Sequence, residues 1–356
     1  MTARLEKFGY EKFFADGFAA ARLDDSVPAR IVIRHKTEYT VITEAGDFRA
    51  AIAGKLRFQT EKVAHLPAVG DWVVFRPNAG ESSGTILAVL PRKSTFSRRV
   101  AGQEEAEQVV AANIDTVFLV SSLDQNFSLR RVERYLVLAA RSGSLPVIVL
   151  NKADLCASLE ETLIEVQRIA GGVPIHITNA KRNEGVQDLL RYLGPGISGA
   201  VLGPSGVGKS TIINRLLGHE KLKTQDVRDY DGKGVHTTSH RELVMLPTGG
   251  LLIDTPGMRE LQLWEGEDGV EETFDDIEQI ATKCRFRNCR HQGEPGCAVQ
   301  QALDDGRLDG ARLRNYQKLL GEIAYQSRQY DSHAREEYKR KVKKITSAQK
   351  RGYKKP

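Results

Sequence analysis

The sequence of 356 residues has little that marks a membrane, secreted or disulfide-stabilised protein. No apolar run approaches the ~20 residues that a bilayer-spanning helix needs. Residues 1–7 contain no apolar core of a signal peptide. Three of the four cysteines lie between positions 284 and 297, which favours a metal site over a disulfide framework. We therefore expect a cytoplasmic protein without a membrane segment.

Positive charge is concentrated at the C-terminal end. The formal net charge is +6, and residues 331–356 contain ten Lys or Arg against three Asp or Glu, which leaves the rest of the chain close to neutral. Such a run is typical either of a solvated chain end or of a segment that contacts a polyanion such as nucleic acid.

The length of the chain favours two or three domains.

The stretch 203–210 reads GPSGVGKS and has the spacing of a phosphate-binding loop. Such a loop turns backbone N–H groups toward phosphates, its lysine reaches the outer phosphates, and its hydroxyl binds Mg²⁺. An apolar strand end precedes it at 200–202, and a helix with an apolar face follows from 211. The candidate phosphate-binding residues are Gly203, Pro204, Ser205, Gly206, Val207, Gly208, Lys209, Ser210 and Thr211, with Lys209 also a candidate catalytic residue.

A second motif identifies the base. Asn151, Lys152 and Asp154 follow an apolar run at 146–150, which places them at the carboxyl end of a buried strand, where ligands bind in such sheets. An aspartate there can accept hydrogen bonds from N1 and N2 of guanine, a pair of donors that adenine lacks. Ala180, after the next predicted strand, can donate its backbone N–H to the guanine carbonyl.

Residues suited to Mg²⁺ and the γ-phosphate come later in the chain. Asp254 and Gly257 form an Asp-x-x-Gly motif after an apolar strand, with Asp254 predicted to hold Mg²⁺ through water and the Gly257 N–H to contact the γ-phosphate. A glycine-hinged segment at 232–239 offers Thr237 or Thr238 as a further Mg²⁺ ligand, and the sequence does not decide between them.

These motifs stand in an unusual order. GTPases normally run from phosphate loop through switch threonine and Asp-x-x-Gly to the guanine tetrad. Here the guanine motifs at 151–154 and 178–180 precede the phosphate loop at 203–210. The set is complete but circularly permuted, which folds tolerate because chain ends often lie close together.

The cysteine cluster has the spacing Cys-x4-Cys-x-His-x5-Cys, formed by Cys284, Cys289, His291 and Cys297. Three thiolates and one imidazole make a closed tetrahedral site, which predicts one structural Zn²⁺.

Upstream of the nucleotide motifs, short alternating strands dominate residues 29–100. Five such strands predict a small barrel, and the oligonucleotide-binding barrel is one five-stranded type. Its recurrent basic side chains, Arg30 among them, are interpreted as facing either RNA or water, and Trp72 as core. Strand–helix alternation from 115 onward predicts a parallel sheet covered by helices.

Together these motifs resemble one family, the circularly permuted, ribosome-small-subunit-dependent GTPases (RsgA/YjeQ). The resemblance rests on the barrel motif at 69–73, the guanine tetrad, the phosphate loop, residues 254–257 and the cluster ending at Cys297. It implies an N-terminal oligonucleotide-binding-type β-barrel, a central circularly permuted α/β P-loop GTPase domain and a mainly helical zinc-binding domain. The expected segments are an extension (1–28), barrel (29–100), GTPase domain (101–265), zinc domain (266–330) and basic tail (331–356).

The resemblance also implies hydrolysis of GTP to GDP, stimulated by the small (30S) ribosomal subunit, in late maturation of that subunit. Partners would be the 30S subunit with its 16S rRNA and GTP or GDP bound with Mg²⁺, and we expect a monomer. Asn179 stands where the family commonly has serine.

Two alternative functions remain beside the GTPase. One is an RNA-binding assembly factor with a structural nucleotide, and the other is a P-loop kinase acting on a small molecule.

The catalytic residue is the least specified part of the prediction. Met258 follows Gly257, where many GTPases have a water-orienting glutamine, and a thioether cannot orient water. Slow intrinsic turnover is therefore expected. His236, beside the switch threonines, is the candidate for positioning the attacking water.

Overall fold

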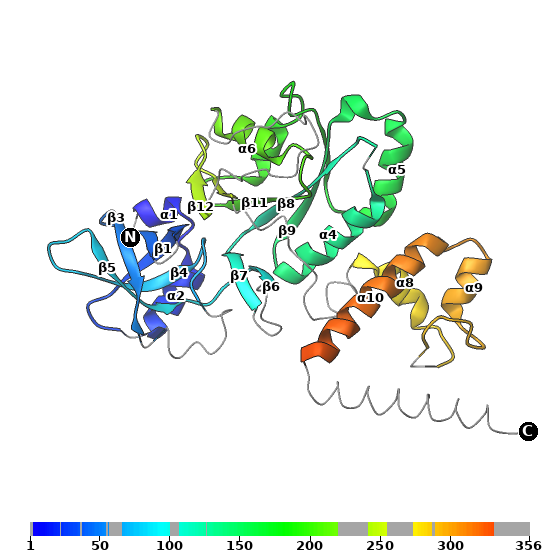
Figure 1. Ribbon diagram of the computed structural model, residues 1–356, viewed down its shortest axis with the longest axis horizontal. Coiled ribbons are helices and arrows are strands. Elements are labelled where there is room, and N and C mark those ends of the chain that lie inside the picture. Colours follow the sequence, from blue (N-terminus) through cyan, green and yellow to red (C-terminus); the bar gives the residue numbers. More distant parts are fainter. Residues whose placement is uncertain are drawn as a thin grey trace, which may run out of the picture. The chain divides into compact units, whose positions relative to one another are not determined.

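The computed structural model describes residues 3–21, 23–35, 38–54, 56, 66–99, 107–125, 127–219, 241–254, 273–286 and 289–330 (Figure 1). The chain divides into two compact units. The first comprises residues 1–98 and 106–262, and the second comprises residues 99–105 and 263–356. No helix in the described ranges is long and apolar enough to cross a membrane.

The N-terminal part of the first unit is a five-stranded barrel, as the sequence predicts. Its strands are β1 (Val27–Arg34), β2 (Tyr39–Ile42), β3 (Asp47–Ile52), β4 (Trp72–Pro77) and β5 (Ser83–Val89). Neighbouring strands pair in the order β1-β2-β3-β5-β4, and pairing of β4 with β1 closes the barrel. Alternation of apolar and polar residues along these strands produces an apolar interior that contains Phe75.

Two helices precede the barrel and cover its Trp72 side. These are α1 (Ala3–Lys7) and α2 (Lys12–Ala21). The rings of Tyr10 and Phe14 lie 4.8 and 5.6 Å from the ring of Trp72, measured between centroids. Trp72 is fully buried, so the prediction that it belongs to the core is confirmed.

A two-stranded sheet of β6 (Thr95–Arg99) and β7 (Glu107–Ala112) leads from the barrel to a parallel sheet. That sheet runs β10 (Ile175–Thr178), β9 (Leu145–Asn151), β8 (Thr116–Ser122), β11 (Ser198–Leu202) and β13 (Leu251–Asp254), with β12 (Arg241–Met245) antiparallel at its end. The predicted apolar runs form these strands, because a strand covered on both faces needs apolar side chains on both.

Helices cover the sheet. α4 (Leu129–Ser142) packs on β8 and β9 and against α5 (Leu159–Ala170), and α6 (Lys209–Leu217) lies beside the 3₁₀ helix η3 (Gln187–Tyr192). Phe118, Val149, Val201 and Ile212 belong to a continuous core beneath α6 and η3. Where strand–helix alternation predicts a helix before the phosphate loop, residues 187–192 form only the short 3₁₀ helix η3.

The parallel sheet and the barrel share a hydrogen-bonded ladder. The end of β1 pairs antiparallel with β12, with Ile33 opposite Glu242 and Arg34 opposite Arg241, so the strands form one eleven-stranded sheet. The sequence predicts a barrel and a parallel sheet but not this junction.

Arg30 corrects one expectation about the barrel. Its side chain is 2% exposed and faces neither RNA nor water. It donates to the carbonyls of Gly70, Phe8 and Asn113 and to Ser198 Oγ, and thereby joins the N-terminal segment, barrel and parallel sheet. Burial lowers the pKa of Arg30 to about 10, so the guanidinium stays charged at neutral pH.

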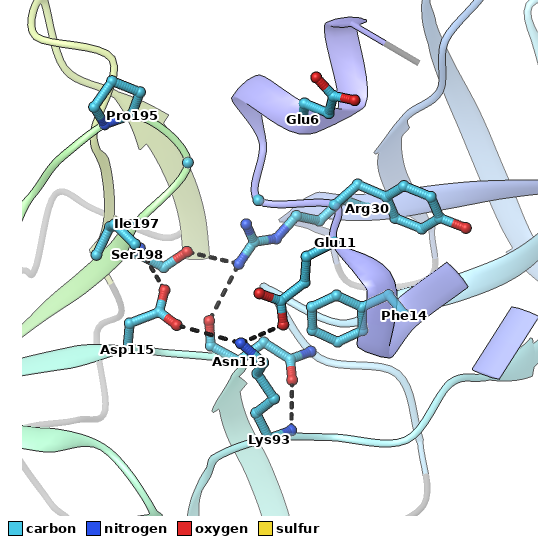
Figure 2. A pocket seen from close by; sticks show the side chains of 13 residues that line it. Glu6, Glu11, Phe14, Arg30, Lys93, Asn113, Asp115, Pro195, Ile197 and Ser198 are labelled. Atoms are coloured by element: carbon cyan, nitrogen blue, oxygen red, sulfur yellow. Dashed lines mark hydrogen bonds and ion pairs between the residues drawn. The ribbon is translucent and has the colours of Figure 1, made fainter. Parts of the chain in front are cut away.

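A pocket of about 190 Å³ lies beside this guanidinium (Figure 2). In it Lys93 pairs with Glu11 and, at 4.0 Å, with Asp115, whose second oxygen accepts a hydrogen bond from the Ser198 N–H. These contacts connect the residue before α2, the segment after β5, the residue before β8 and the first residue of β11.

The second unit is mainly helical. Its described helices are α8 (Asp275–Ala281), α9 (Ala298–Asp304) and α10 (Gly310–Tyr330). Phe274 and Tyr316 pack 5.5 Å apart, and Arg312 pairs with Asp276 at 2.8 Å. Between α9 and α10 the chain turns through Gly306, whose φ is +71°, so the last helix begins only at Gly310.

Candidate functional site

The candidate nucleotide site lies at the edge of the sheet where five parallel strands end. β9 pairs in parallel with β10 and β8, and β11 with β8 and β13, so all five strands point the same way. Their carboxyl ends therefore share one edge, which is where ligands bind in such sheets. The motifs that the sequence separates by more than a hundred residues, from Asn151 to Asp254, follow or end these strands.

The phosphate loop joins β11 to α6, as predicted. Gly203 follows the last residue of β11, and Lys209 and Ser210 open the helix, whose N-terminus carries partial positive charge. Lys209 is 8% exposed, and its ammonium group donates to the carbonyls of Gly203 (2.7 Å) and Pro204. The lysine thus lies over the loop that it is predicted to serve.

Asn151 connects this loop to the guanine motifs. The residue is 2% exposed, and its Nδ2 donates to the carbonyl of Val207 at 2.8 Å. Its Oδ1 accepts from the Ala180 N–H at 2.9 Å and from Thr178 Oγ1 at 3.0 Å. One amide therefore fixes three loops against one another, a role that the tetrad pattern alone does not reveal.

The fit between Asn151 and the loop requires glycine at position 208. Gly208 has a φ of +101°, and a Cβ there would lie 2.2 Å from Asn151 Nδ2. A side chain would therefore collide with the amide as well as strain the backbone.

Lys152 and Asp154 occupy the turn after β9. Lys152 has left-handed backbone angles (φ 60°, ψ 44°) and begins the 3₁₀ helix η2 (Ala153–Leu155), in which Asp154 is exposed to solvent. The Lys152 ammonium group lies 2.9 Å from Asp124 Oδ2. Sequence reasoning missed Asp124, although a carboxylate two residues beyond a buried strand at this edge is a usable signal.

Arg215 is a second residue that sequence reasoning missed. From the last turn of α6 it donates to the carbonyls of Ala180 (3.2 Å) and Lys181 (3.0 Å). The helix that follows the phosphate loop therefore also holds the turn predicted to contact the guanine carbonyl. Only the three-dimensional arrangement reveals this contact, since Arg215 belongs to no nucleotide motif.

The remaining predicted residues of this site are not described. His236, Thr237, Thr238 and Gly257 lie outside the described residues, and only the backbone of Asp254, the last residue of β13, lies within them. Their roles stay predictions.

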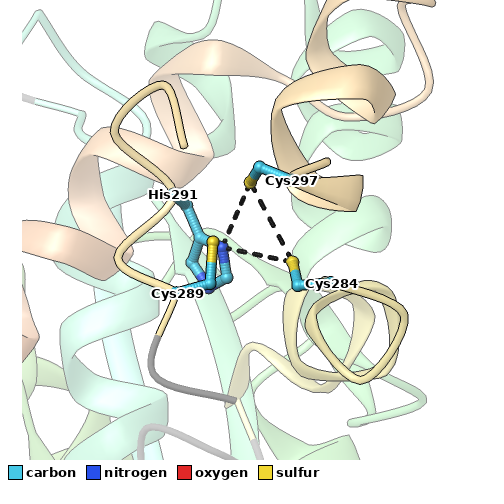
Figure 3. A group of neighbouring side chains, drawn as sticks. All are labelled: Cys284, Cys289, His291 and Cys297. Atoms are coloured by element: carbon cyan, nitrogen blue, oxygen red, sulfur yellow. Dashed lines mark hydrogen bonds between the residues drawn. The ribbon is translucent and has the colours of Figure 1, made fainter. Parts of the chain in front are cut away.

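The second unit holds the predicted metal-binding cluster (Figure 3). One ligand atom from each of Cys284, Cys289, His291 and Cys297 lies within 4.8 Å of the others. Cys284 Sγ is 3.9 Å from Cys297 Sγ and 3.6 Å from His291 Nδ1. Tetrahedral Zn²⁺ with Zn–S bonds of about 2.3 Å would set its sulfurs about 3.8 Å apart, so the cluster fits a metal of that size.

Hydrogen bonds around the four candidate ligands hold the cluster in place. Cys297 caps α9 and accepts a hydrogen bond from the Gln300 N–H at 3.3 Å. Glu294 accepts from the N–H groups of Gln292 (2.7 Å) and Arg290 (2.9 Å), which lower the pKa of its carboxyl to about 2. Burial lowers the pKa of His291, which favours the neutral imidazole that binds metal.

A phosphate loop and a preceding guanine tetrad that meet at one sheet edge define a circularly permuted GTPase. Comparisons with known proteins agree with this class. A family model described as RsgA GTPase matches residues 89–264. A relative from Opitutus terrae, the "Small ribosomal subunit biogenesis GTPase RsgA", is 47% identical over 336 residues that cover 92% of each chain.

Two solved structures share the architecture. The crystal structure of YjeQ from Thermotoga maritima is similar with a TM-score of 0.60 and 30% identity, covering 84% of this chain and 98% of that one. YloQ, described as a circularly permuted GTPase, matches with a TM-score of 0.59 and 25% identity, covering 85% and 96%. The chain belongs to the RsgA GTPase family.

Proposed function

We propose that this GTPase acts in late maturation of the small ribosomal subunit, which stimulates its hydrolysis of GTP to GDP and phosphate. The observation that carries the proposal is the junction that Asn151 makes between the phosphate loop and the guanine motifs. The relatives named as small-subunit biogenesis GTPases, which match over most of the chain, support the ribosomal role. The protein would work in the cytoplasm, as a monomer.

The roles of the site residues follow from their positions. Asp154 would accept from N1 and N2 of guanine. The Ala180 N–H, which donates to Asn151 Oδ1 in this structure, would be shared with the guanine carbonyl when nucleotide binds. The backbone N–H groups of the non-proline residues in 203–208 and the Lys209 ammonium would hold the phosphates, and Thr211 would assist from the first turn of α6.

Mg²⁺ bound with GTP would supply charge neutralisation at the transferring phosphoryl group. Ser210 in the first turn of α6, Asp254 at the end of β13, and Thr237 or Thr238 are the residues proposed to hold it. The Gly257 N–H would contact the γ-phosphate, and His236 would position water. If the His236→Ala protein binds GTP normally and keeps its full subunit-stimulated turnover, His236 has no catalytic role.

The second unit would hold one structural Zn²⁺ through Cys284, Cys289, His291 and Cys297. Its closed set of four protein ligands leaves no position for a reacting water.

RNA of the small subunit, 16S rRNA, is the proposed contact for the barrel and the basic C-terminal segment. Arg49 and Arg76, exposed on β3 and β4, supply positive charge on the barrel.

The decisive experiment measures multiple-turnover GTP hydrolysis alone and with small subunits, large subunits or free 16S rRNA. The proposal expects strong stimulation by small subunits only. Equal stimulation by both subunits, or none by either, would contradict the ribosomal part of the proposal. Binding of GTP without turnover under every condition would instead favour an assembly factor in which the nucleotide is structural.

A further inference from the structure

Lys152 of the guanine tetrad is held by a carboxylate from the neighbouring strand end. Its Nζ lies 2.9 Å from Asp124 Oδ2, and the two side chains are only 27% and 17% exposed. Both side chains are therefore partly shielded from water. Ion pairs that are exposed to water contribute little to stability. A charge-assisted hydrogen bond in this setting is stronger than one between exposed groups.

The sheet itself brings the two residues together. β8 and β9 pair in parallel with Ser122 opposite Asn151, and the Leu123 N–H continues the ladder by donating to the Asn151 carbonyl at 2.8 Å. Asp124 follows Leu123 and Lys152 follows Asn151, so the two residues stand just beyond the paired ends of β8 and β9. Their meeting is thus fixed by strand register and does not depend on a long loop.

The backbone at Lys152 has a conformation that needs support. Its left-handed φ of 60° is unfavourable for a residue that has a Cβ. This residue starts the 3₁₀ turn that carries Asp154 two positions later. Whatever fixes Lys152 also fixes the start of the turn that presents the guanine-binding carboxylate.

We propose that Asp124 is a positioning residue of the guanine site. By holding the Lys152 ammonium group it keeps the lysine in one conformation and stabilises the turn that leads to Asp154. This inference rests on the guanine site proposed above. Asp124 acts through Lys152 and need not touch the nucleotide.

A double-mutant cycle tests the proposal on the full chain. The variants are Asp124→Asn, Lys152→Met and the double variant, with affinity for fluorescent N-methylanthraniloyl-GDP measured by titration. Asp124→Asn removes the charge at constant size and is expected to raise the GDP dissociation constant roughly three- to tenfold. In the Lys152→Met background the same change should have less than about a twofold effect.

Two further variants separate positioning from general effects. Asp124→Glu keeps the charge and should retain most of the affinity. Asp188→Asn removes a carboxylate that pairs with Arg191 at 3.7 Å, where both side chains are 60% exposed, and should leave the affinity unchanged. Thermal melting of each variant shows whether it is folded.

Every other outcome contradicts either the proposed role of Asp124 or the guanine site on which that role rests. Unchanged affinity in Asp124→Asn means that its charge does not position the guanine site, and tighter affinity means that its charge repels the nucleotide phosphates. Equal effects in both backgrounds mean that Asp124 does not act through Lys152. Each of these results ends the proposal while the guanine site stands, provided that Lys152→Met itself weakens GDP binding. Unaltered GDP affinity in Lys152→Met would contradict the guanine site, and this inference with it.

Discussion

Arg30 Nη2 donates to Ser198 Oγ at 2.8 Å, although 168 residues separate the two in sequence. The bond joins the first strand of the barrel to the strand that ends in the phosphate loop. It is one of four hydrogen bonds that the buried guanidinium makes, and its Cζ also lies 5.6 Å from the centre of the Trp72 ring. The N-terminal segment, barrel and sheet thus all bond to one cation.

The Arg30→Met variant should be much less stable than the natural protein. Methionine fills part of the volume but removes the donor to the carbonyls of Phe8 and Asn113 and to the Ser198 hydroxyl. The Gly70 carbonyl keeps the Asn113 amide as a donor. We expect a loss of about 3–5 kcal/mol in the free energy of unfolding, measured by urea denaturation of the first unit. Arg49→Met, on the exposed side of β3, is the matched control and should lie within about 0.5 kcal/mol of the natural protein. Similar losses in both variants would contradict this account of Arg30.

Gly208→Ala should disrupt the nucleotide site more than Gly206→Ala does. Both glycines have positive φ, but only at position 208 would the added Cβ meet the Asn151 amide, while at position 206 it meets nothing within 4 Å. Gly206→Ala therefore carries only backbone strain of about 1–2 kcal/mol. Gly208→Ala should in addition separate Asn151 from the loop, with GDP affinity reduced more than about tenfold.

The comparison of the two glycine variants uses thermal melting and GDP titration together. Both substitutions lie in the loop, so a difference between them reports the collision with Asn151. Equal losses would show that the contact with Asn151 contributes nothing to the site.

Asp154→Asn should change the preferred base. The asparagine amide can donate to the carbonyl that xanthine carries where guanine has an amino group, and it can no longer accept both guanine donors. We expect affinity for GDP to fall at least tenfold and that for xanthosine diphosphate to rise, measured by competition titration. Glu161→Gln, an exposed carboxylate in the first turn of α5, is the control. Loss of both nucleotides to the same extent would contradict base recognition by Asp154.

Metal removal should unfold the cluster region selectively. One equivalent of Zn²⁺ is expected by elemental analysis, and Cys284→Ser or a strong chelator should lower the melting temperature of the second unit, because metal-binding energy is folding energy in such sites. The cluster belongs to the other compact unit from the phosphate loop, so GDP affinity should change less than about twofold. A chain that contains no zinc and melts identically with chelator would contradict the structural site.

Sequence patterns predicted the local features of this protein well. Buried parallel strands must be apolar on both faces, so β8, β9, β11 and β13 stand out as apolar runs, and the phosphate loop and the cysteine spacing depend on residues close together in sequence. The burial of Arg30 was not predictable, because its partners Gly70, Asn113 and Ser198 come from distant segments. The Asp124–Lys152 pair likewise depends on the register between two strands, which no local pattern specifies.

The pairing of β1 with β12 has a consequence for dissecting the chain. A fragment that begins after the barrel would present β12 with its outward N–H and C=O groups unpaired, since β1 supplies their partners at Ile33 and Arg34. Unpaired strand edges recruit strands from other molecules. Such a fragment would expose the edge of β12 that β1 covers in the whole protein, and it would tend to aggregate through that edge.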